Sequence, residues 1–131
     1  MLMKKIMVFL FAAIFVVAVL AFAVEVKKTE LRPAQIVMQA RAAWLTAMNK
    51  NLGAGDFPAI VKDADQLAAQ TKKIGDAQAN PLAKDITLAV SMFAKEASAA
   101  AAKKDAATVK VKLGAIKGKC DECHAKIRDK K

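Results

Sequence analysis

The chain has 131 residues, and its 22 Lys and Arg against 12 Asp and Glu give a formal net charge of +10. This length is enough for one compact domain but not for two. The basic surface attracts acidic partners, whereas one Trp, no Tyr and no basic-aromatic motif speak against nucleic-acid binding.

A positive start, an apolar run and a small-residue exit open the chain: MLMKK, residues 6–20, then Ala-Phe-Ala at 21–23. These are the parts of a secretory signal peptide, so we expect cleavage after residues 1–23 and export of residues 24–131 to the periplasm. The alternative is an uncleaved membrane anchor, because residues 6–24 are 19 apolar residues. Cleavage removes two Lys and no acid, which leaves 20 basic and 12 acidic residues, a net charge of +8.

Good helix formers dominate the exported part, and no alternating strand pattern interrupts them. Pro33 suits the first turn of a helix, which the Gly-rich segment NLGAGD at 51–56 ends. A second helix is expected to begin at Asp56 or Phe57 and to run to about Gly75.

Two further helices follow from their N-terminal signals. Asn80 followed by Pro81 predicts an N-cap and the first residue of a third helix, which ends near Lys103 or Lys104. Asp105 caps a fourth helix, which is expected to continue to the terminus.

Each expected helix carries one apolar stripe at helical spacing, as in helices that pack against one another. The stripes are Ala34, Val37, Met38, Trp44, Leu45, Met48 and Leu52; Phe57, Ile60, Val61, Ala64, Leu67, Ala68 and Ile74; Leu82, Ile86, Ala89, Val90, Phe93 and Ala97; and Val109, Leu113, Ile116, Cys120, Cys123 and Ile127. Four amphipathic helices with short links predict an all-α fold, an antiparallel up-and-down four-helix bundle.

The sequence KCDECHAK places both cysteines, Cys120 and Cys123, next to the only histidine, His124. A zinc site normally needs four protein ligands if it is structural, or three and a water if it is catalytic. The exported chain supplies only these two thiols and one imidazole, with Asp121 and Glu122 as spare carboxylates, so zinc is the weaker interpretation. A thiol-disulfide enzyme needs a low-pKa cysteine, which a helix N-terminus favours, whereas this pair lies near a helix C-terminus with two carboxylates between the sulfurs. A disulfide across so short a loop would stabilise little.

Covalent attachment of haem is the interpretation that fits best. Each thiol adds to a vinyl group, and His124 ligates the iron from the proximal side. On a helix the three positions share one face, so two thioether links and one axial bond can converge on a single ring. We therefore expect one haem c, held by Cys120, Cys123 and His124.

A haem in a bundle needs a second wall, and the first expected helix supplies a candidate. Arg41 lies within the apolar stripe of that helix, beside Met38, Trp44 and Leu45. A charge at such a position either finds a buried partner or extends to solvent. A haem propionate is a natural partner for a guanidinium.

With these residues the chain resembles the cytochrome c-prime family, exported four-helix bundles with Cys-x-x-Cys-His on the last helix. The resemblance covers residues 30–131. It implies that Arg41 lies near the propionates, that Leu45 faces the distal side of the iron, and that Arg128 lies on the proximal side. Ile127 departs from the aromatic residue that is frequent in the family.

The sixth ligand of the iron stays open at this stage. Leu45 has no donor atom, so the family register predicts an open distal site that can admit nitric oxide or carbon monoxide. Met38 and Met48 lie on the same stripe, and either thioether is an alternative ligand. An antiparallel first helix puts residues 37–42 level with His124, which favours Met38 or Leu45 over Met48.

One haem without a paired catalytic acid and base predicts an electron carrier rather than an enzyme. The expected partners are periplasmic redox proteins, and acidic ones would be steered by a collar of basic residues near the haem. This collar consists of Lys117, Lys119, Lys126, Arg128, Lys130 and Lys131. The alternative function is a module that binds nitric oxide or carbon monoxide. The family resemblance also implies a homodimer.

Overall fold

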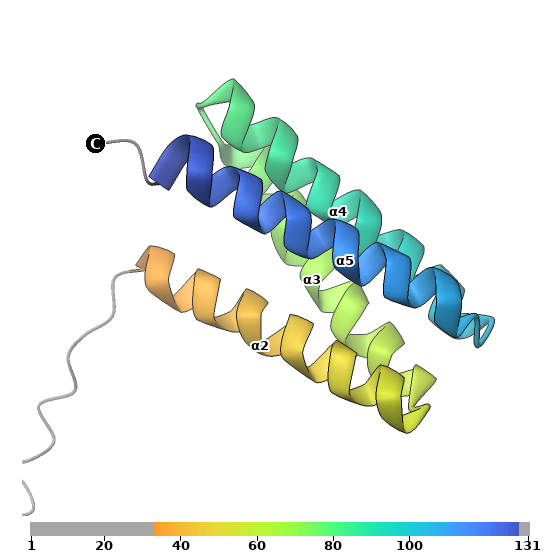
Figure 1. Cartoon of the computed structure of the whole chain (residues 1–131). Coiled ribbons are helices and arrows are strands. Elements are labelled where there is room, and N and C mark those ends of the chain that lie inside the picture. The colour runs from red at the N-terminus through yellow and green to blue at the C-terminus, as the bar shows by residue number, and fades with distance from the viewer. Residues whose placement is uncertain (1–32, 129–131) are drawn as a thin grey trace, which may run out of the picture. The chain divides into compact units, whose positions relative to one another are not determined.

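The computed structural model describes residues 33–128, and these form an antiparallel bundle of four α-helices with no strand among them (Figure 1). The elements are α2 (Pro33–Ala54), α3 (Phe57–Ala77), α4 (Pro81–Ala102), α5 (Ala106–Cys123) and a π-helical turn, η1 (His124–Arg128). Successive helices alternate in direction, so the beginning of α2 and the end of α5 lie at the same end of the bundle (Figure 1). The expected fold is confirmed.

Some expectations fall outside the described residues. The signal peptide at residues 1–23 and the basic residues Lys130 and Lys131 are among them, and Arg128 is described only in its backbone. Between residues 33 and 128, no helix combines the length and the hydropathy that crossing a membrane requires.

Side-chain caps fix where three of the helices begin, as the sequence predicted. The Asp56 carboxylate accepts a hydrogen bond from the backbone N–H of Ala59 at 3.2 Å. The Asn80 side-chain oxygen accepts from two backbone N–H groups at 2.9 and 3.2 Å. Asp105 accepts from the N–H of Thr108 at 3.1 Å. These bonds satisfy N–H groups that have no partner within their own helix.

Removal of the Asn80 cap is expected to cost about 1 kcal/mol of unfolding free energy, because Asn80→Ala leaves two N–H groups of α4 without their acceptor. Urea denaturation of the variant and the parent would measure it. Gln78→Ala is the matched control, since Gln78 is exposed and its side chain caps no helix. Equal losses in both variants would contradict a capping role.

The tightest packing is between α3 and α4. The hydroxyl of Ser91 on α4 donates to the backbone carbonyl of Ala68 on α3 at 2.8 Å, inside the core. A Cβ on Gly75 would lie 2.8 Å from the Leu88 side chain. Gly75 was expected near the end of its helix, but the helix continues to Ala77. Gly75 therefore allows α3 and α4 to approach closely and does not end α3.

The first helix of the bundle, α2, buries less of its stripe than its sequence predicted. Met48 is fully buried, and Trp44, Leu45 and Leu52 are partly covered. Met38 is 42% exposed. The reason is that α2 packs mainly on α3 and only lightly on α5. Most residues in its N-terminal half are therefore exposed.

The fourth helix also departs from expectation at its end. It was expected to continue as one helix, but the α-helix ends at Cys123, and residues 124–128 form the wider π-helical turn. The α-helical spacing that aligns Cys120, Cys123 and His124 holds up to the histidine. It no longer holds for Ile127, whose place on the stripe was derived from α-helical periodicity.

Candidate functional site

A pocket of about 200 Å³ lies at the end of the bundle where α2 begins and α5 ends, and it opens to solvent. Side chains from all four helices line it, and most of its surface is apolar. The residues that line it are Met38, Arg41, Ala42, Leu45, Leu67, Ile86, Thr87, Val90, Ile116, Lys117, Lys119, Cys120, Asp121, Cys123 and His124.

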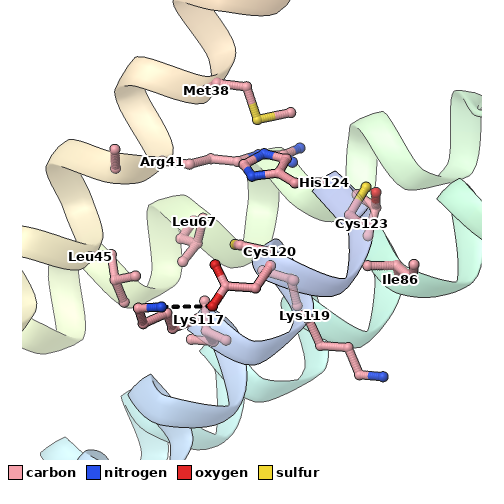
Figure 2. A pocket seen from close by; sticks show the side chains of 15 residues that line it. Met38, Arg41, Leu45, Leu67, Ile86, Lys117, Lys119, Cys120, Cys123 and His124 are labelled. Atoms are coloured by element: carbon pink, nitrogen blue, oxygen red, sulfur yellow. Dashed lines mark hydrogen bonds and ion pairs between the residues drawn. The ribbon is translucent and has the colours of Figure 1, made fainter. Parts of the chain in front are cut away.

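Cys120, Cys123 and His124 all line this pocket, as their helical spacing predicted (Figure 2). Both cysteines are free and half-buried. Burial raises the pKa of the Cys120 thiol, and the nearby Arg41 opposes this effect only in part. Cys120 is therefore a protonated thiol at neutral pH, unlike the thiolate that a thiol-disulfide enzyme needs.

Arg41 enters the pocket from α2, opposite the cysteines (Figure 2). Its Nε donates a hydrogen bond to the side-chain oxygen of Gln70 on α3 at 3.0 Å. Its Nη2 is buried, and no hydrogen-bond acceptor for it exists among the described residues. Burial lowers the pKa of Arg41, and the two cysteines act in the opposite direction. A buried guanidinium nitrogen without an acceptor is costly, which indicates a partner other than the residues between 33 and 128.

The structure separates the two methionines that the sequence left open. Met38 and Leu45 both line the pocket, whereas Met48 belongs to the hydrophobic core and does not line it. Met38 lies at the pocket margin, since 42% of it is exposed. Of these three residues of α2, only Met38 could therefore donate to a group in the pocket, through its thioether sulfur. Leu45 presents only methyl groups.

The charges beside the pocket are paired within their own helix. Lys117 contacts Asp121 at 2.6 Å, and Lys119 and Lys126 both contact Glu122 at 2.8 Å. The hydrogen bonds from Lys119 and Lys126 lower the pKa of Glu122 to about 2. Three lysines of the expected basic collar are thus largely neutralised at close range, so the described part of this surface is less basic than the lysine spacing suggested.

Several lining residues were not singled out as site residues from the sequence. Leu67, Ile86, Val90 and Ile116 were identified only as core positions, and Thr87 was not identified at all. Their apolar stripes show that they face inward, but not that they face a pocket. Gln70 was also missed, because nothing local distinguishes a glutamine that meets Arg41 from one that faces solvent.

The residues at the pocket fit a haem in their chemistry. Two thiols and an imidazole lie on one wall, a partnerless guanidinium nitrogen on the other, and apolar side chains between them. No group of three or more His, Cys, Asp and Glu between residues 33 and 128 is arranged to hold a bare metal ion. The volume is below the roughly 300–1,000 Å³ of common ligand pockets. A larger group would therefore extend through the open mouth of the pocket.

Comparison of the chain with protein-family models, with curated proteins and with solved structures gave no significant match. The resemblance to the cytochrome c-prime family accordingly depends on this chain's own residues, chiefly Cys120, Cys123 and His124 with Arg41 and Leu45 opposite them.

Proposed function

We propose that the protein is an exported c-type cytochrome of the cytochrome c-prime type that carries one covalently attached haem and transfers single electrons between periplasmic redox partners. The observation that supports this most is the convergence on one apolar pocket of Cys120, Cys123, His124 and Arg41, whose buried Nη2 has no acceptor among the described residues. Zinc binding and thiol chemistry would leave the buried Arg41 nitrogen unexplained.

Each residue of the pocket has a separate role in this proposal. Cys120 and Cys123 would hold the haem through two thioether links, for which each thiol supplies its sulfur and its hydrogen. A ring nitrogen of His124 would ligate the iron, and the Arg41 guanidinium would pair with a propionate. When bound, the haem supplies an iron centre that accepts and releases one electron.

The shape and charge of the site support electron transfer. The apolar lining would keep water away from the part of the bound group that lies within the pocket, and the open mouth would leave one edge within reach of a partner. The pairing of Lys117, Lys119 and Lys126 with carboxylates predicts only a weak dependence of partner association on salt from this part of the surface.

A second candidate function is the binding of nitric oxide or carbon monoxide. It is favoured by Leu45, which lines the pocket opposite the cysteines without offering a donor atom. The ferrous protein separates the two functions: ready uptake of carbon monoxide supports gas binding, and a spectrum that carbon monoxide leaves unchanged supports an electron carrier.

Mass spectrometry and absorption spectroscopy test the proposal itself. The chain would be produced with a working haem-maturation system and purified from the exported fraction. We expect the polypeptide mass plus one haem, and a coloured protein that one electron reduces reversibly. A bare polypeptide mass under these conditions would refute the proposal, and titratable thiols in a colourless protein would favour a thiol enzyme.

Substitution of Met38 tests the distal side. Met38→Leu is expected to leave the ferrous and ferric spectra unchanged, because a side chain that is 42% exposed at the pocket margin is poorly placed as a buried ligand. Met92→Leu on α4 is the matched control, since Met92 is 50% exposed and does not line the pocket. A change from a low-spin to a high-spin spectrum in Met38→Leu alone would show instead that Met38 ligates the iron.

A further inference from the structure

The contact between Arg41 and Gln70 links α2 to α3 behind the pocket. The hydrogen bond from Arg41 Nε to Gln70 Oε1 is 3.0 Å long and partly buried, and the two residues are 29 positions apart. Gln70 does not line the pocket, whereas Arg41 does. The Gln70 amide therefore contacts Arg41 but not the pocket.

The geometry of a guanidinium makes this contact informative. Its N–H donors lie in one plane as a rigid fork, so a hydrogen bond at Nε limits rotation of the whole group. A neutral amide oxygen accepts this bond without neutralising the positive charge. The charge therefore remains for another acceptor, and Nη2 is buried without one among the described residues. A carboxylate matches such a fork through two parallel hydrogen bonds.

The other groups near Arg41 do not meet this requirement. The ionisable side chains that act on the charge of Arg41 are Cys120 and Cys123, and neither is a carboxylate. The carboxylates of Asp121 and Glu122 are occupied by lysines on the same helix segment. Residues 33–128 thus hold no acceptor for Arg41 Nη2, and we expect it to come with the occupant of the pocket.

We propose that Gln70 is a positioning residue that fixes the Arg41 guanidinium as the carboxylate receptor of the pocket. This inference rests on the proposed function, in which the carboxylate is a propionate of the haem. Gln70 acts only through Arg41, so its removal has no effect of its own once Arg41 is gone.

A double-mutant cycle on the reduction potential of the holoprotein tests this dependence. Arg41→Gln is expected to lower the potential, because loss of a fixed positive charge makes the more positive, oxidised site easier to form. Gln70→Leu is expected to lower it in the same direction by a smaller amount. In the Arg41→Gln background, Gln70→Leu is expected to cause no further shift.

Two controls separate positioning from a general structural effect. Gln66→Leu places the same substitution at an exposed position of α3 and should leave the potential unchanged. Gln70→Glu keeps an acceptor for the Nε–H of Arg41. Hydrogen exchange of this Nε–H, followed by NMR of the reduced protein, should therefore stay slow in Gln70→Glu and become fast in Gln70→Leu. The inference would be overturned if Gln70→Leu shifted the reduction potential equally in the parent and in the Arg41→Gln background. It would also be overturned if Arg41→Gln shifted the potential of the parent and Gln70→Leu did not. Either result would leave the proposed function intact.

Failure of the proposed function itself gives a different result. If mass spectrometry shows no haem, the same variants are titrated with sodium propionate at constant ionic strength, with sodium chloride as reference, and the Arg41 Nε–H signal is followed. Propionate-dependent shifts in the parent that persist in Gln66→Leu and weaken in Gln70→Leu would support the carboxylate receptor with another occupant. No propionate-dependent shift in the parent would overturn it.

Discussion

Replacement of His124 with alanine is expected to lower the yield of haem-loaded protein by more than about tenfold, because even loss of an outer-shell partner costs about 10–100-fold in metal affinity. His124 is the only histidine of the chain, and it lines the pocket beside Cys120 and Cys123. No second imidazole can replace it. Absorption per milligram of purified protein, with the mass spectrum, measures the effect.

Two comparisons make the His124 result specific. Lys110→Ala changes an exposed residue of α5 away from the pocket and should keep full haem loading. Cys120→Ser should retain a single thioether link through Cys123, and therefore a haem that is still attached but with an altered spectrum. Unchanged colour and spectrum in His124→Ala would contradict proximal ligation by this residue.

Met48→Ala is expected to cost about 2–5 kcal/mol of unfolding free energy, the range for deletion of a large buried side chain. Met48 is completely buried, and it is the one residue of α2 with that degree of burial among the described positions. Since α2 packs lightly on α5, few other contacts compensate for the cavity. Urea denaturation at fixed oxidation state and haem content measures the loss.

Met38→Ala is the matched variant, because it removes the same side chain from the same helix at a position that is 42% exposed. Its cost in unfolding free energy is expected to stay within about 0.5 kcal/mol. Equal losses at positions 38 and 48 would show that α2 is rotated relative to the arrangement described above.

The charges around the cysteines illustrate a signal that the sequence contained and that was overlooked. Lys117 and Asp121 are four residues apart, as are Glu122 and Lys126, and such pairs meet on a helix surface. Six basic residues were counted as a collar without their acidic neighbours. The sequence alone would have predicted the pairing that the structure shows.

The sequence by itself determined where the helices begin and which residues of the last helix act together. Asp56, Asn80 and Asp105 were identified as starting signals, and all three cap their helices. The alignment of Cys120 and His124 on one face follows from helical spacing. These features depend on atoms within a few residues along the chain, so the local sequence is sufficient.

Only the tertiary structure decided which parts of different helices meet. Met38 and Met48 lie on one stripe, yet one reaches the pocket and the other the core. Gln70 meets Arg41, and Gly75 meets Leu88, across helix pairs. Such contacts depend on how far each helix is rotated and shifted against its neighbour. That arrangement is set by the packing of all the side chains together, which no single stripe specifies.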